Sequence, residues 1–241
     1  MSCKARRMAK SPGKPKHAKA KAPGNATPSP PADLGAKTST VIWPKGQIIH
    51  RMHLNAYVGD QFNPGLKGNA RFSPIVDGAG AAIPTLYGGH DVRLRRHGDR
   101  FFHDVPFTSG LKTYDKGKLT GQTYSRLEPQ QDLILADLSA TALRRFGIRR
   151  TELIDTEKDR YRHTRLWAEA FYAARPDIQG LCWVSRQDDR ALAIILFGNR
   201  LSAGALVTVS PSLDLIGTPG VYTDLISLAE RIGVKVVPGS S

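Results

Sequence analysis

Five residues that could hold and cleave a phosphorylated, flat-ringed ligand lie far apart along the chain: Arg51, Arg71, Tyr87, Asp99 and Ser185. Arginine binds a pyrophosphate through paired N–H groups, tyrosine stacks on a base or nicotinamide ring, and a serine hydroxyl can hydrogen-bond a ribose. A carboxylate stabilises the oxocarbenium-like state formed when an N-glycosidic bond breaks. Each residue alone fits an ordinary strand surface, but together they predict one cleft shaped for a dinucleotide.

Other kinds of site are disfavoured. His50 and His53 lie in an expected strand, where their spacing points them at different faces, and no cluster of Cys or carboxylates accompanies them, so no metal site is expected. Gly78 and Gly80 have no following helix, and no GxxxxGK[ST] loop occurs. Ser185 lacks the Gly-x-Ser-x-Gly elbow, which disfavours a Ser/His/Asp hydrolase.

Many short strands and a few longer helices are expected to position these residues. Alternating and β-branched patterns predict strands at 47–52, 70–75, 82–87, 123–127, 133–138, 180–184, 192–197 and 205–209. Helices are expected at 139–146, 158–174 and 222–232, the last ending at Gly233, a natural C-cap. Because the strands do not alternate with helices as in βαβ units, the pattern predicts an α+β domain, not a doubly wound sheet.

The positive charge is concentrated at the N-terminus. Of the formal charge of +14, eight Lys or Arg and no acidic residue lie in residues 1–22. Residues 1–40 are rich in Lys, Ala, Pro, Gly and Ser and have little to bury, which predicts a disordered arm before a folded domain at 41–241. Such an arm could bind nucleic acid weakly and without sequence preference through residues 1–22, or serve only as a solvated tail.

The cysteine count and hydropathy indicate a soluble protein of a reducing compartment. Cys3 and Cys182 are the only cysteines, so neither a disulfide framework nor a cysteine zinc site is expected. No apolar run approaches the roughly 18–20 residues needed to span a bilayer, and the N-terminus lacks the apolar core of a secretory signal. We therefore expect a cytoplasmic location and no membrane partner.

Several sequence blocks in a fixed order resemble the RES-domain family, named for an Arg, a Glu and a Ser, and within it the proteobacterial branch. The resemblance covers about four-fifths of the chain, from about 41 to 238. The blocks are Ala70-Arg-Phe-Ser-Pro-Ile75, Ile83-Pro-Thr-Leu-Tyr87, Phe102-His-Asp-Val-Pro106, Thr151-Glu-Leu-Ile-Asp-Thr-Glu157 and Gly180-Leu-Cys-Trp-Val-Ser-Arg-Gln-Asp-Asp189.

The resemblance implies a fold like that of mono-ADP-ribosyltransferases, with two packed, mainly antiparallel sheets and a few flanking helices. It implies cleavage of NAD at the nicotinamide–ribose bond by a hydrolase, phosphorylase or ADP-ribosyltransferase, with NAD as substrate and no prosthetic group. It also implies a toxin of a toxin–antitoxin pair with a helix-turn-helix antitoxin. By position, Arg51 and Arg71 would hold the phosphates, Tyr87 would stack, and Ser185 would contact the nicotinamide-side ribose.

The chain departs from the family in the segment 90–100. Counting back from His103 and Asp104 places Asp99 where the family has its catalytic Glu. Asp is one methylene shorter, and a displacement of about 1 Å can cost about a hundredfold in a positioned site. The departure predicts impaired catalysis, and it leaves two alternatives open: a catalytically inactive RES-fold interaction protein, or a nucleic-acid-binding protein acting through the arm.

A shifted reading frame would account for this departure. Permissible codons for residues 89–100, read one base later, spell Gly-Thr-Thr-Phe-Asp-Cys-Ala-Ala-Met-Glu-Thr, which is similar to the helix pattern of the family. We hypothesise that residues 90–100 arise from such a shift, through a sequencing error or a real pair of indels. The coding DNA decides between a native Asp99 and a lost glutamate.

Overall fold

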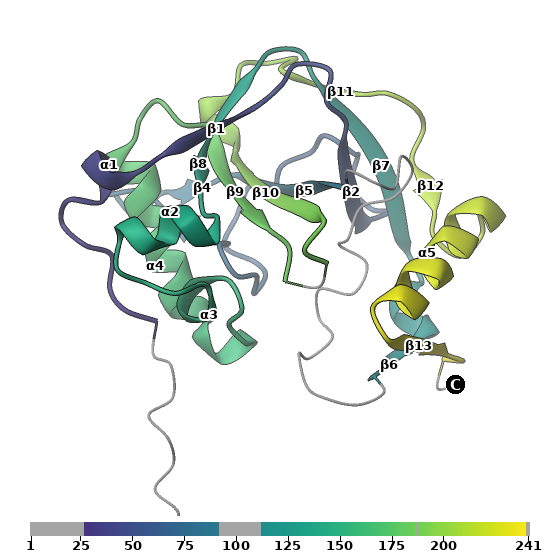
Figure 1. Cartoon of the computed structure of the whole chain (residues 1–241). Helices are drawn as coiled ribbons and strands as arrows, with labels where there is room; N and C mark the ends of the chain where they lie inside the picture. The colour runs from purple at the N-terminus through teal and green to yellow at the C-terminus, as the bar shows by residue number, and fades with distance from the viewer. Residues whose placement is uncertain (1–26, 92–111, 187, 240–241) are drawn as a thin grey trace, which may run out of the picture.

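The architecture is a large curled sheet with helices gathered at its two ends (Figure 1). The computed structural model describes residues 27–91, 112–186 and 188–239. Helices α2, α3 and α4 lie together on one side, whereas α5 lies at the other end beside the small strands β6 and β13 (Figure 1). None of the helices in these ranges is long and apolar enough to cross a membrane.

The elements follow in this order: α1 (Leu34–Lys37), β1 (Thr40–Trp43), β2 (Ile49–Leu54), β3 (Ile75–Val76), β4 (Ala82–Ile83), β5 (Thr85–Asp91), β6 (Lys112–Asp115), η2 (Lys116–Leu119), β7 (Gln122–Pro129), β8 (Leu133–Asp137), α2 (Ala140–Arg145), α3 (Arg150–Leu153), η3 (Lys158–Arg160), α4 (Tyr161–Ala174), β9 (Gly180–Val184), β10 (Ala191–Phe197), η4 (Gly198–Arg200), β11 (Leu206–Thr208), β12 (Leu213–Asp214), α5 (Pro219–Arg231) and β13 (Val234–Val237).

The main sheet has nine strands in the order β1-β8-β9-β10-β5-β2-β7-β11, with β12 also paired to β7. All of its pairs are antiparallel except β8 with β9. That parallel pair needs a long crossover connection, which α2, α3 and α4 supply. The expected mainly antiparallel α+β class is confirmed, although the strands form one curled sheet with two small two-stranded sheets beside it.

Apolar side chains form separate clusters on the two sides of the central strands. Trp167 and Phe171 of α4 are fully buried with Leu181 and Ile195 from the sheet. A cluster on the other face includes Ile49, Leu86 and Ile194, and a third lies beneath α5. The alternation along each strand thus fixes which side chains face α4.

The packed part of the chain begins earlier than the expected boundary at residue 41. Leu34 is only 2% exposed and belongs to the cluster beneath α4. The indole N–H of Trp167 donates to the Pro28 carbonyl at 2.7 Å. The low apolar content of residues 1–40 as a whole hid these anchored positions. Residues 1–26, which include the basic stretch 1–22, lie outside the described residues.

Candidate functional site

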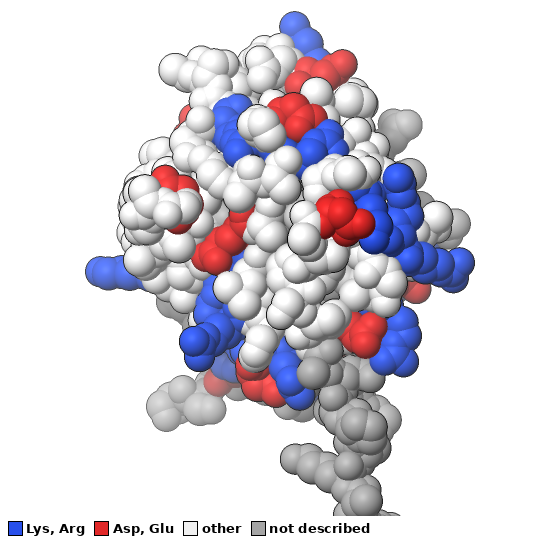
Figure 2. Space-filling view, turned by 90° about the vertical axis from the view of Figure 1, so that its left-hand side faces the viewer, with Lys and Arg blue, Asp and Glu red and all other residues white. Residues whose placement is uncertain are grey.

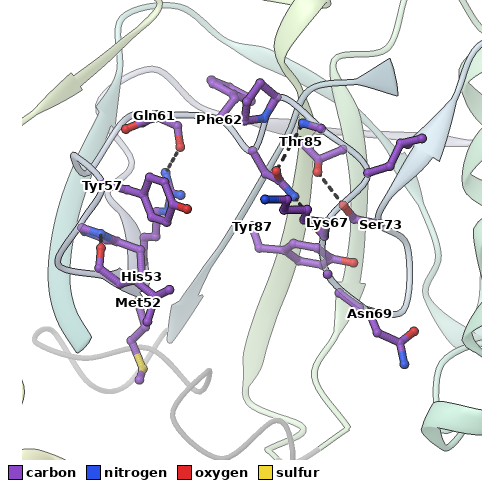
Figure 3. A pocket seen from close by; sticks show the side chains of 18 residues that line it. Met52, His53, Tyr57, Gln61, Phe62, Lys67, Asn69, Ser73, Thr85 and Tyr87 are labelled. Carbon is purple, nitrogen blue, oxygen red and sulfur yellow. Dashed lines mark hydrogen bonds between the residues drawn. The ribbon is translucent and has the colours of Figure 1, made fainter. Parts of the chain in front are cut away.

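A cavity of about 760 Å³ lies between the end of β2, the start of β5 and the segment 55–70. Strands β2 and β5 pair only through His50 and Gly89, so no strand partner fills the space beyond that point. Figure 3 shows His53 and Tyr57 on one side of this pocket and Ser73, Thr85 and Tyr87 on the other. The pocket has aromatic rings on both walls, which suits a flat-ringed ligand.

Arg51 lies on the pocket wall and ties the segment 55–70 to β2. Its Nη1 donates to the carbonyls of Gly59 at 2.6 Å and Gln61 at 2.7 Å. These bonds occupy one terminal nitrogen of the guanidinium. Arg51 therefore shapes the pocket wall whether or not it also reaches a phosphate.

Tyr87 joins the pocket to a second group of polar residues. Its ring lines the pocket and packs edge-on against Trp183, with ring centroids 6.2 Å apart. Its hydroxyl accepts a hydrogen bond from the backbone N–H of Phe72 at 2.7 Å. Because Phe72 directly follows Arg71, this bond fixes the backbone at Arg71.

Arg71 and Arg186 converge on one backbone carbonyl. Both guanidinium groups donate to the Thr156 oxygen, at 3.3 Å from Arg71 and 2.7 Å from Arg186. Arg71 also lies over the Tyr161 ring, 5.4 Å from its centroid. Burial lowers the pKa of Arg71, the nearby Tyr161 phenol raises it, and the charge of Arg186 lowers it further. The Nε–H of Arg71 is buried and has no hydrogen-bond partner among the described residues.

Ser185 and a third arginine complete this group. Ser185 follows β9, is 6% exposed, and continues the strand pairing because its N–H donates to the Ala191 carbonyl at 2.8 Å. Arg150 donates to the Ser185 carbonyl at 2.6 Å and pairs with Asp155 at 3.0 Å. We call Arg71, Arg150 and Arg186 the basic cluster.

The sheet register places Tyr87 and Ser185 on one face. Tyr87 pairs with Ile195, and Ile195 pairs with Leu181, so these three side chains share a face. Ser185 is four residues beyond Leu181 and faces the same way, because side chains alternate with a period of two. The structure thus places Arg71 next to Tyr87 and Arg186, and it places Ser185 on the same sheet face as Tyr87 but four residues farther along the strands. Arg51 lies on the wall of the pocket.

Asp99 lies outside the described residues, so its position relative to Arg71, Tyr87 and Ser185 is not described. The sequence reasoning missed Arg150, Arg186 and Tyr161. Arg186 directly follows Ser185 in the chain. The Thr156 carbonyl that it shares with Arg71 is a backbone group, which has no sequence signature.

A series of hydrogen-bonded side chains lies behind the pocket wall that carries His53 and Tyr57. His53 Nδ1 lies 2.9 Å from the Leu54 carbonyl, which can only accept, so Nδ1 carries the proton and Nε2 accepts from Ser125 Oγ at 2.7 Å. Ser125 Oγ in turn lies 2.6 Å from Ser212 Oγ. Burial lowers the pKa of His53, which fits this neutral ring.

His50 points to the other face and contacts the Tyr124 hydroxyl at 2.5 Å, so the two histidines face apart as expected. Across residues 27–91, 112–186 and 188–239, no three His, Cys, Asp or Glu residues are grouped to hold a metal ion.

The surface over the helices carries charges of both signs. Figure 2 shows Lys and Arg side chains interspersed with Asp and Glu on this face. Ion pairs account for part of the pattern, with Arg149 and Glu152 3.2 Å apart and Arg175 and Asp177 2.6 Å apart. Among the residues that the structure describes, this face shows no single broad basic surface for nucleic acid.

Comparisons with known proteins bear on the family and the fold of the chain. A family model described as RES domain matches residues 48–216. No curated protein matches the chain. Among solved structures, a chain of the crystal structure of the M. tuberculosis MbcT–MbcA toxin–antitoxin complex superposes with a TM-score of 0.51 at 14% identity, covering 80% of this chain and 93% of that chain. At this identity the likeness concerns the fold.

Proposed function

The chain belongs to the RES-domain family, and from that premise we propose that it cleaves NAD at the bond between nicotinamide and ribose. The observation that carries the proposal is Arg71, a buried guanidinium whose Nε–H has no hydrogen-bond partner among the described residues. It lies beside Arg186, and the residue that follows it, Phe72, is hydrogen-bonded to Tyr87 of the pocket wall. A buried cation with an unused donor favours an anionic ligand, and a pyrophosphate supplies several acceptor oxygens.

Each site residue would have a separate role in binding or cleavage. Arg71 and Arg186 would neutralise the pyrophosphate, Arg51 would support the pocket wall, Tyr87 would stack on a flat ring, and Ser185 would orient the nicotinamide-side ribose. The glycosidic C–N bond breaks and its electron pair leaves with neutral nicotinamide. The acidic residue at position 99 would stabilise the positive charge left on the sugar. Water, phosphate or a protein side chain then accepts the ADP-ribose.

Nicotinamide release from NAD by the full chain tests the proposal. Arg71→Lys keeps a positive charge but loses the paired donors, and we expect kcat/KM to fall about a hundredfold. Ser185→Ala should lower it about tenfold. Arg149→Gln is the matched control, because it removes an exposed arginine whose partner is Glu152 on the helical surface. Release that is saturable and unchanged in Arg71→Lys and Ser185→Ala would contradict the proposal.

A second candidate is a catalytically inactive RES-fold protein that binds an antitoxin. It is favoured by the segment 90–100, where Asp99 replaces the expected glutamate. The superposed chain comes from a toxin–antitoxin complex, which supports a protein partner here, and we propose one of the helix-turn-helix type. Stable binding of a co-expressed antitoxin by a chain that leaves NAD intact would favour this candidate over the first.

A further inference from the structure

The C-terminal helix α5 lies beyond the residues matched by the family model, which end at 216. It nevertheless contacts the turn that follows Ser185 and the pocket strand β2. In its last turn, Arg231 Nη2 lies 2.6 Å from Asp188 Oδ2. The two side chains are 27% and 9% exposed, so Asp188 is the more buried partner of this ion pair. A basic residue in the last turn is also favoured by the helix dipole.

Asp188 belongs to the turn that follows Ser185 and Arg186. Its Oδ1 accepts from the Arg190 N–H at 3.1 Å, and its carbonyl accepts from the Ala191 N–H at 3.0 Å. The Ser185 N–H then donates to the Ala191 carbonyl. One carboxylate oxygen therefore shapes the turn, and the other joins the turn to α5.

The same turn is held on its other side by the basic cluster. Arg150 donates to the Ser185 carbonyl at 2.6 Å and lies 3.7 Å from Asp189. Helices α3 and α5 thus hold the turn between them. Helix α5 also supports the pocket strand, because Met52 of β2 lines the pocket and packs against the cluster that contains Leu225 and Leu228.

We infer that Arg231 and Asp188 are positioning residues, which set the placement of Ser185 and Arg186 against the ligand. Asp188 lies within the residues matched by the family model, whereas Arg231 acts on it from outside them. The inference rests on the proposed function. The ion pair acts through the backbone: it fixes the turn, the turn fixes Ser185 through Ala191, and Arg186 follows Ser185 directly. A displacement of about 1 Å at such a group is enough to lower a rate strongly.

The test uses the full chain with Arg231→Gln, Arg231→Lys and Asp188→Asn, and Lys235→Gln as a control that removes an exposed charge from β13. We expect Arg231→Gln and Asp188→Asn to lower kcat/KM for NAD about tenfold and to speed hydrogen exchange in a peptide spanning 183–191 about tenfold. Arg231→Lys should stay within about threefold of the unaltered chain, and Lys235→Gln should match it.

The measurements distinguish a positioning role of the ion pair from a purely structural one. Faster exchange with unchanged kcat/KM would make the pair structural only and overturn the inference, as would exchange and activity equal to the Lys235→Gln control. If the unaltered chain releases no nicotinamide, the proposed function fails by itself. The affinity for ADP-ribose, measured by calorimetry in the same variants, then takes the place of kcat/KM, and an unchanged affinity would overturn the inference.

Discussion

Replacing Tyr87 by Phe removes one oxygen atom at the point where the pocket meets the basic cluster. In the native protein this hydroxyl accepts from the Phe72 N–H at 2.7 Å, and Phe72 is 0% exposed. The variant leaves that amide without its acceptor, and an unsatisfied buried donor costs about 1–3 kcal/mol. Because the pocket beside Tyr87 can admit water, we expect the lower part of that range, about 1–2 kcal/mol.

Urea unfolding followed by circular dichroism measures this cost. With a slope of about 2 kcal/mol per molar urea, the midpoint should fall by about 0.5–1 M. The ring and its packing against Trp183 remain, so the loss reports the hydroxyl alone. Nicotinamide release should fall about tenfold, since the bond fixes the backbone next to Arg71.

Tyr172→Phe is the matched control. The Tyr172 hydroxyl also accepts one hydrogen bond, from Asn199 Nδ2 at 2.6 Å, but at an exposed site where water can replace it. The control should change the free energy of unfolding by less than about 0.5 kcal/mol. Equal urea midpoints for the two variants would refute the claim that Tyr87 secures the Arg71 backbone.

Further tests concern other parts of the chain. Burial lowers the pKa of His53 below its usual 6.5, so on unfolding the chain takes up a proton there as the pH falls. The free energy of unfolding should therefore decrease below about pH 6.5, and His53→Gln should reduce this decrease. A Cβ on Gly180 would lie 2.0 Å from a carbonyl oxygen of β10, whereas one on Gly78 would meet nothing within 4 Å; Gly180→Ala should cost about 3 kcal/mol or more in a thermal melt and Gly78→Ala almost nothing. Asp99→Glu should raise NAD cleavage about tenfold, and a chain with the restored helix at 90–100 still more; no gain in either variant, or codons that cannot encode that helix in the next frame, would remove the frameshift hypothesis.

Local signals predicted most of the framework. The expected strand at 180–184 matches β9, and the expected strand at 192–197 matches β10 to within one residue. Gly233 takes the positive φ of 70° expected after a helix. These features depend on neighbouring residues, which the sequence displays directly.

The segment around Arg71 was predicted less well. The expected strand at 70–75 is wrong, because the described chain there has an isolated bridge between Ala70 and Ser73, and β3 covers only Ile75–Val76. Here the backbone follows distant partners, the Tyr87 hydroxyl and the Thr164 side chain, which local alternation cannot reveal. The use of Arg51 to hold the Gly59 and Gln61 carbonyls was hidden for the same reason.

The strand order has a consequence for synthesis. Strand β5, which carries Tyr87, reaches β9, which leads into Ser185, only through β10 between them. On a ribosome, a growing polypeptide that has not yet released residues 191–197 lacks the strand that joins these two halves. The surface shared by Tyr87 and Ser185 can therefore form only after residues 191–197 have left the ribosome, later than the two strands that these residues join were made.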